Sequence, residues 1–213
     1  MRPGLNWFDM EQGSLEWHQI RAGKITGTAA AALLVNGKGP DGLGVEAWNL
    51  IYRLAGEIIT GETETPEFDT FATLRGKNME GLAIQEYESE TFRSANRIGF
   101  VQWGDFAGAS PDFMVDEERG GEVKCLLAPG HLRYCHTREI EKAHFAQVQW
   151  ALFVTGFQVW DLVHFHPKAG KMRLVIDEIR PDYEMHGVFS ERLSLIAERI
   201  GRVVAMCQEE ITA

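Results

Sequence analysis

Apolar positions in the first half of the chain recur at the spacing of amphipathic helices. Ser14 is the predicted N-cap of the first helix, which ends near Gly23. The helices expected in this half cover residues 15–22, 29–35, 45–57 and 68–92. The third is expected to pack through Trp48, Ile51, Tyr52 and Ala55, and the fourth through Leu74, Leu82, Ile84 and Tyr87. The glycine-rich segment 36–44 and the acidic segment 61–67 predict loops.

The second half changes to short segments bounded by glycine, proline or charge, a pattern typical of strands. The expected strands cover residues 98–103, 113–116, 121–127, 157–166 and 171–179. Helices are expected over residues 139–155 and from Pro181 almost to the end. Because no repeat or linker interrupts this order, the sequence predicts a single α/β domain spanning residues 1–213.

Composition limits the possible functions. The chain has 213 residues, 45% of them hydrophobic, which is enough for one sizeable core. No segment has the apolar run of a membrane span, and the three cysteines have no paired spacing, so we expect a cytoplasmic protein without disulfides. The formal net charge of −10 argues against tight non-specific DNA binding, because phosphate contacts need cations. It does not exclude a metal-dependent nuclease, since the carboxylates that hold cations are acidic.

The most informative polar motif is Ser110-Pro111-Asp112, followed ten residues later by Glu122-Val123-Lys124. Because strand side chains alternate between faces, Glu122 and Lys124 share a face, and a hairpin would bring Asp112 beside them. Two carboxylates and an ammonium group suit Mg²⁺-assisted phosphodiester hydrolysis, in which Lys124 orients or deprotonates the attacking water or neutralises charge. Taken alone, the motif fits a solvated surface hairpin better.

Three residues on predicted helices add to this motif. Glu80 is a candidate further carboxylate, although a helical glutamate is ordinarily solvated. His144 and Gln147 lie three residues apart on one helix face, whereas Gln149 points away. Gln147 is a candidate for holding a water or a phosphate, and capping or packing is the ordinary alternative.

A second polar cluster lies close to the start of the chain, beside a predicted helix start. Its members are Trp17, His18, Arg21, Thr26 and Thr28. Exposed amides at a helix start can receive a phosphate, and Arg21 can clamp it with two hydrogen bonds. The cluster therefore predicts a phosphate-binding site, which Trp17 adjoins.

Together and in this order, these motifs resemble the phage lambda exonuclease family, also called YqaJ-like viral recombinases. The matching stretches are WHQIRAGKITGT (Trp17–Thr28), RGKNMEGLAIQEYE (Arg75–Glu88), SPDFMVDEERGGEVKC (Ser110–Cys125) and AHFAQVQWALFVTG (Ala143–Gly156). The resemblance implies a restriction-endonuclease-like PD-(D/E)xK core with a mixed central sheet flanked by helices. It also implies a processive 5′-to-3′ exonuclease that acts on the ends of linear double-stranded DNA, releases mononucleotides and leaves a 3′ overhang. Family members resemble ring-shaped homotrimers that work with a single-strand annealing protein.

The resemblance also implies roles for the acidic residues. Asp112 and Glu122 would bind Mg²⁺ with the carbonyl group of Val123, and Glu80 would complete the shell of a second ion. Mn²⁺ is expected to substitute for Mg²⁺.

The remaining roles implied by the resemblance concern water and DNA. Lys124 would assist the attacking water, with Gln147 nearby. The residues expected to bind the 5′-phosphate or the adjoining DNA are Arg21, Thr26, Thr28, Trp17 and His144.

The sequence departs from the family's pattern at three places. Thr28 stands where a serine is common, and His144 stands where an aromatic residue is familiar. Residues 126–130 replace a proline-containing run, so a phosphate-contacting arginine expected just beyond the motif is in doubt. His131 and Arg133 are the candidate substitutes.

Two other functions are compatible with these motifs. An endonuclease or resolvase on the same fold would need no free DNA end. A catalytically silent DNA-end-binding scaffold is disfavoured, because it has no reason to keep Glu80, Asp112, Glu122 and Lys124 together.

Other histidines, cysteines and tryptophans have ordinary interpretations. Candidate zinc ligands are Cys125, His131, Cys135 and His136. Their spacing fits no paired pattern, so a zinc site is disfavoured. His164 and His166 share a strand face and are expected to be exposed at a sheet edge. The tryptophans expected in the core are Trp103, Trp150 and Trp160.

Overall fold

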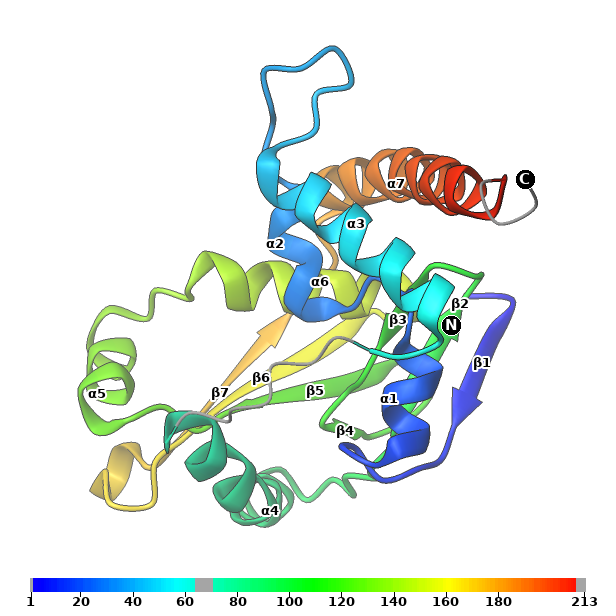
Figure 1. Ribbon diagram of the computed structural model, residues 1–213. Helices are drawn as coiled ribbons and strands as arrows, with labels where there is room; N and C mark the ends of the chain where they lie inside the picture. The colour runs from blue at the N-terminus through cyan, green and yellow to red at the C-terminus, as the bar shows by residue number, and fades with distance from the viewer. Residues whose placement is uncertain (1, 64–70, 210–213) are drawn as a thin grey trace.

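Residues 2–63 and 71–209 are described by a computed structural model, apart from the side chains of residues 71–73, 77 and 209. Two small sheets lie between helices (Figure 1). The strands are β1 (Leu5–Phe8), β2 (Phe100–Trp103), β3 (Ala107–Ala109), β4 (Phe113–Met114), β5 (Arg119–Lys124), β6 (Val159–Phe165) and β7 (Leu174–Ile179). The helices are α1 (Leu15–Arg21), α2 (Ala30–Leu33), α3 (Val45–Thr60), α4 (Phe71–Thr91), α5 (Ala128–Thr137), α6 (Lys142–Thr155) and α7 (Tyr183–Glu209). Two short 3₁₀ helices, η1 (Gly27–Ala29) and η2 (Gly170–Met172), complete the order.

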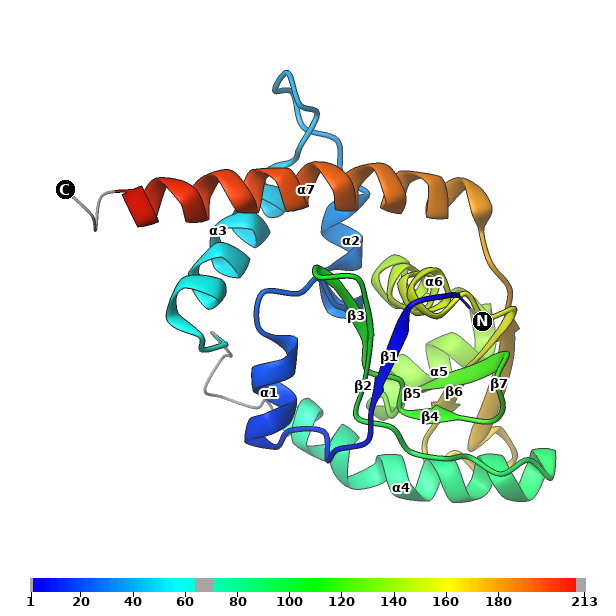
Figure 2. The ribbon, with the colours of Figure 1, turned by 90° about the vertical axis from the view of Figure 1, so that its right-hand side faces the viewer.

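The larger sheet has the strand order β4-β5-β6-β7, and it is mixed. Strands β5 and β6 are parallel, whereas β4 and β7 pair antiparallel with their neighbours. Helix α4 covers one face, where Tyr87 and Ile84 pack against Phe113 and Val163. Helix α6 lies over the other face (Figure 2). The expected mixed sheet flanked by helices is confirmed.

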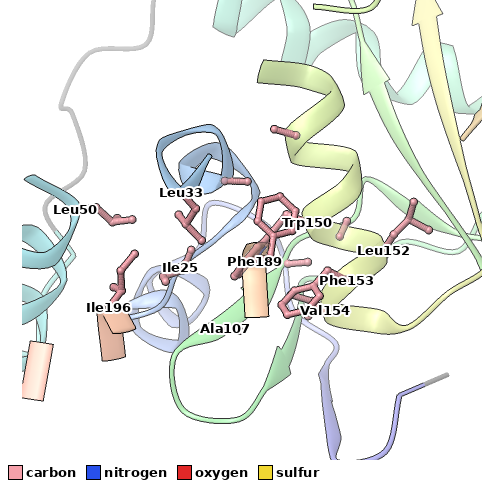
Figure 3. Packing of buried hydrophobic residues seen from close by; sticks show 14 of the residues in the cluster. Ile25, Leu33, Leu50, Ala107, Trp150, Leu152, Phe153, Val154, Phe189 and Ile196 are labelled. Atoms are coloured by element: carbon pink, nitrogen blue, oxygen red, sulfur yellow. The ribbon is translucent and has the colours of Figure 1, made fainter. Parts of the chain in front are cut away.

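The smaller sheet, β1-β2-β3, is antiparallel and packs beside α6. Its neighbours form the main hydrophobic core, in which the fully buried Trp150 of α6 lies near Phe189 of α7 and Ile25 (Figure 3). Helices α3 and α7 pack together above this core (Figure 2). None of the described helices is long and apolar enough to cross a membrane.

Several sequence-based expectations about secondary structure need correction. Strands β1 and β3 and helix α5 were not predicted. The expected strand 113–116 has only two paired residues, and the expected helix 29–35 is split between η1 and α2. The parts of the expected acidic loop and helix that fall on residues 64–70 lie outside the described residues.

Burial also differs from the predicted pattern. Tyr52 is 59% exposed, and Leu74 and Leu82 are 49% and 47% exposed. His164 is buried rather than exposed at an edge, because β6 lies between β5 and β7 and both of its faces are covered. Trp150 and Trp160 are fully buried, as expected, whereas Trp103 is partly exposed beneath the guanidinium group of Arg2.

Candidate active site

The hairpin of β4 and β5 brings Asp112 beside the β5 residues expected to act with it. The backbone N–H group of Asp112 donates to Gly121 at 3.1 Å, which continues the antiparallel pairing by one residue. Asp112 Oδ2 then accepts from the backbone N–H of Val123 at 2.6 Å. The Asp112 carboxylate is therefore fixed against the middle of the Glu122-Val123-Lys124 segment.

Glu122, Lys124 and Gln147 form a closed triangle of hydrogen bonds. Lys124 Nζ donates to Glu122 Oε1 at 2.8 Å and to Gln147 Oε1 at 2.9 Å. Gln147 Nε2 donates to the same Glu122 oxygen at 2.6 Å. Both ends of the Gln147 amide are thus used, and α6 is tied to the edge of β5 at this point.

Glu80 of α4 lines an open groove of about 560 Å³ together with Asp112, Glu122 and Lys124. Its carboxylate forms an ion pair with Arg97 at 3.2 Å. Within residues 2–63 and 71–209, no three His, Cys, Asp or Glu side chains lie in an arrangement that could hold a metal ion as they stand. Two of the predicted ligands are instead paired with cations, Glu80 with Arg97 and Glu122 with Lys124.

Burial and mutual repulsion perturb the pKa values of the ionisable groups at this site. Burial, followed by repulsion from Glu122 and Glu80, raises the pKa of Asp112 well above its usual range. Burial also raises the pKa of Glu80, although Arg97 opposes this shift. Burial alone would lower the pKa of Lys124, but attraction to Glu122, Asp112 and Glu141 together outweighs burial, and the pKa is raised. Hard oxygen donors gathered under mutual repulsion are the kind of site that a divalent cation stabilises.

The second polar cluster forms a separate pocket of about 170 Å³ around the guanidinium group of Arg21. Arg21 Nη1 donates to Ser110 Oγ at 2.6 Å, and Nη2 approaches Thr26 Oγ1 at 3.5 Å. The hydroxyl groups of Thr26 and Thr28 are 3.4 Å apart. The guanidinium group lies 3.9 Å over the Trp17 ring. Burial, followed by repulsion from Arg53, lowers the pKa of Arg21 to about 10, so it is charged at neutral pH.

Asp112 and Glu122 line this pocket as well as the groove. The carboxylates therefore stand between a small cationic pocket with hydroxyl groups and an open groove that contains Glu80. Gln147 also lines the pocket, so the hydrogen-bonded triangle borders it.

The sequence that builds this site matches a known family. Residues 16–158 match the YqaJ-like viral recombinase domain. The chain belongs to this family. The comparison with curated proteins gave no match.

Solved structures confirm the fold of this YqaJ-like chain. An alkaline exonuclease (LHK-Exo) from Laribacter hongkongensis superposes with a TM-score of 0.82 at 22% identity, covering 93% of this chain and 98% of the other. The same exonuclease in complex with dAMP gives a TM-score of 0.81 at 22% identity, with the same coverage. A phage-related exonuclease from Haemophilus somnus 129PT gives a TM-score of 0.69 at 14% identity, covering 86% of this chain and 96% of the other. Membership of the family supports a nuclease role.

The structure separates one predicted DNA-contacting residue from the others. His144 lines the groove with Lys124 and Glu80, not the pocket with Arg21. Burial, followed by repulsion from Lys124, lowers its pKa. His144 therefore lies on the Glu80 side of the carboxylates, and a direct contact with a group held by Arg21 is not expected.

The proposed substitutes for the missing arginine are placed differently from each other. His131 is fully buried and its Nε2 lies 2.7 Å from the carbonyl oxygen of Met172, so it cannot contact DNA. Arg133 is exposed and pairs with Glu141 at 3.2 Å. No three of the described cysteines and histidines lie in an arrangement that could hold a metal ion.

Two pocket residues were missed by sequence reasoning. Ser110 Oγ accepts from both Arg21 and the Trp17 indole, at 2.6 and 3.1 Å. Gln12 lines the same pocket and donates to the carbonyl oxygen of Pro111 at 2.8 Å. Ser110 could have been found from its place directly before Pro111-Asp112, whereas Gln12 carries no signal in the sequence.

Proposed function

We propose that this protein is a Mg²⁺-dependent 5′-to-3′ exonuclease that processes the 5′-phosphorylated ends of linear double-stranded DNA. The observation that carries the proposal is the position of Asp112 and Glu122 between the Arg21 pocket and the groove. A terminal phosphate held in the Arg21 pocket would put the next phosphodiester beside the carboxylates. Such an arrangement favours removal of nucleotides one at a time from a 5′ end.

Asp112, Glu122 and the carbonyl group of Val123 would hold one Mg²⁺, and Glu80 would join the shell of a second. The repulsion between the buried carboxylates supports this assignment. Mg²⁺, when bound, lowers the pKa of the attacking water and offsets the charge that develops on the phosphate oxygens. Mn²⁺ has similar oxygen preferences and is expected to substitute.

The side chains of the chain itself supply positioning and proton handling. Lys124 stands within hydrogen-bonding reach of Glu122 and Gln147, and it would orient the attacking water or donate to the phosphate. Arg21 would bind the terminal phosphate with two donors, and the hydroxyl groups of Thr26 and Thr28 would add neutral donors. Trp17 would hold the guanidinium plane from below.

The comparisons support the same reaction class. The two solved relatives are named exonucleases, and one of them was crystallised with dAMP, a mononucleotide. The family name supports a role in recombination. In that role, a 3′ overhang would pass to a single-strand annealing protein.

We further propose a ring-shaped homotrimer, on the family resemblance. A ring around the duplex would also explain how a chain with a net charge of −10 stays on DNA, because encirclement replaces strong phosphate attraction. Light scattering tests this directly, and a monomer mass would rule out the ring.

The decisive experiment compares three duplexes in Mg²⁺: linear with a 5′-phosphate, linear with a 5′-hydroxyl, and covalently closed circular. The expected result is rapid release of mononucleotides from the 5′-phosphorylated linear duplex, slower release from the hydroxyl end, and an intact circle. EDTA should stop all release. Cutting of the circle would show an endonuclease, and no cutting of any duplex would show a silent end-binding protein.

A further inference from the structure

Glu57 is a buried carboxylate close to the proposed phosphate pocket, but it does not line that pocket. It is 2% exposed and lies in the last turn of α3. Its two oxygens have separate partners: Oε2 accepts from the backbone N–H of Gly23 at 2.9 Å, and Oε1 accepts from Arg53 Nη1 at 2.8 Å. A buried charged group destabilises the fold unless it is paired, so these two contacts are needed to keep Glu57 buried at this position.

The Gly23 turn is the segment that carries Arg21 into the pocket. Helix α1 ends at Arg21, and the chain turns through Gly23 toward Thr26 and Thr28. Gly23 has a φ of +71°, and a Cβ atom there would lie 2.5 Å from Ile58 Cγ1. The turn therefore sits directly on α3 at Glu57 and Ile58, and its position relative to Arg21 depends on that contact.

Arg21 itself is partly buried and has no carboxylate in contact with it. Among the described residues it makes no ion pair, and its donors are directed to the hydroxyl groups of Ser110 and Thr26. Both carboxylate oxygens of Glu57 accept hydrogen bonds from other groups, the Gly23 N–H and Arg53. A carboxylate in contact with Arg21 would compete with an incoming phosphate, whereas one that is held at the turn leaves the guanidinium donors available.

We propose that Glu57 is a positioning residue for 5′-phosphate recognition: through its hydrogen bond to Gly23 it fixes the turn that aims Arg21 and the two threonines at the terminal phosphate. This inference rests on the proposed role of Arg21. It makes Glu57 an indirect determinant of specificity that touches neither the DNA nor the proposed metal ligands.

The test measures binding of a DNA hairpin with one blunt end, carrying either a 5′-phosphate or a 5′-hydroxyl, by fluorescence anisotropy in EDTA. The readout is the ratio of the two affinities. Glu57→Ala and Glu57→Asp both lose the bond to Gly23, and each should reduce the ratio about tenfold, as expected when a binding group is slightly misplaced. Glu57→Gln keeps an acceptor for Gly23 and should keep the wild-type ratio, although its melting temperature should fall because the Arg53 pair is lost.

The opposite behaviour of the Gln variant separates positioning from stability. A merely structural Glu57 would leave the ratio unchanged in all three variants while the melting temperature falls, and that result would overturn the inference. If Glu57→Ala does not fold, the affinity ratio of Glu57→Asp tests the inference. This variant retains the negative charge and only shortens the side chain by one carbon. Glu46→Gln, an exposed change on the same helix, is the matched control.

Arg21→Ala in the same assay separates the two levels of the proposal. A lower ratio for Arg21→Ala with an unchanged ratio for Glu57→Ala would reject the role of Glu57 alone. An unchanged ratio for Arg21→Ala would reject the phosphate pocket and the role of Glu57 together. In Mg²⁺, loss of positioning should raise KM for the phosphorylated end more than it lowers kcat.

Discussion

Gln147 donates its amide N–H to Glu122 Oε1 at 2.6 Å across the junction of α6 and β5. The other end of the same amide accepts from Lys124, so the orientation of the group is fixed by both neighbours. An amide suits this place better than a carboxylate, because it offers a donor to the glutamate and an acceptor to the lysine.

We predict that replacing this amide lowers kcat with little loss of stability. Gln147→Ala should reduce kcat about 10- to 100-fold, because Lys124 and Glu122 lose the group that orients them. Gln147→Glu should be at least as damaging, because it places a second carboxylate against Glu122. Single-turnover digestion of a 5′-phosphorylated duplex measures the effect. Unchanged kcat in both variants would remove Gln147 from the mechanism.

Gly27 gives an independent way to disturb the same side chain. A Cβ atom at Gly27 would lie 2.8 Å from Gln147 Cγ, so Gly27→Ala should push Gln147 away from Glu122. We expect about a tenfold loss of kcat, with a melting temperature within a few degrees of wild type, since the strain falls on one side chain. Gly56→Ala, where a Cβ atom meets nothing within 4 Å, is the matched control. Equal activity of the two variants would contradict the prediction.

The sequence predicted the part of the site whose residues lie close together in the chain. Asp112 and Glu122 are joined by a short hairpin, so their spacing was sufficient to predict that they meet. Ser110 was overlooked because its role depends on Arg21 and Trp17, which lie about ninety positions away in the chain. Arg97 likewise pairs with Glu80 only through the packing of α4, which no local pattern reveals.

The errors in the fold have physical causes of the same kind. Strand β6 is buried on both faces, so the alternation that would have located His164 is absent. Helix α5 buries only His131 and Tyr134 and has a proline and a glycine in its first turn, so its apolar signal is weak. Strands β1 and β3 have four and three residues and are defined by their partners rather than by their own sequence.

Asp112 should be essential for cleavage and costly for stability in the absence of metal. Asp112→Asn keeps an acceptor for the Val123 N–H but removes a buried charge that Glu122 and Glu80 repel. We expect cleavage to fall at least about 1000-fold, while DNA binding is retained and the melting temperature in EDTA rises. Added Mg²⁺ should raise the melting temperature of the wild type more than that of the variant. Exposed Asp105→Asn is the control, and near-wild-type hydrolysis by Asp112→Asn would exclude the assigned role.

His164 predicts how stability responds to acid. Its ring is 1% exposed and stacks on Tyr134 at 3.5 Å, and burial, followed by repulsion from His144, His131, Lys124 and Arg138, lowers its pKa from 6.5 to about 3. His164 is therefore protonated near pH 6.5 in the unfolded chain, but only near pH 3 in the folded chain. Stability from this group is full above pH 6.5 and falls as the pH drops through that window, by about 1.4 kcal/mol per pH unit.

His164→Phe keeps the stacking on Tyr134 and removes the proton-binding group. Urea unfolding at several pH values should give a free energy of unfolding that declines less steeply below pH 6.5 in the variant than in the wild type. His136→Phe, on the exposed side of α5, controls for the loss of a histidine as such. Parallel declines for wild type and His164→Phe would mean that His164 becomes protonated in the folded protein, and that its burial does not limit stability in acid.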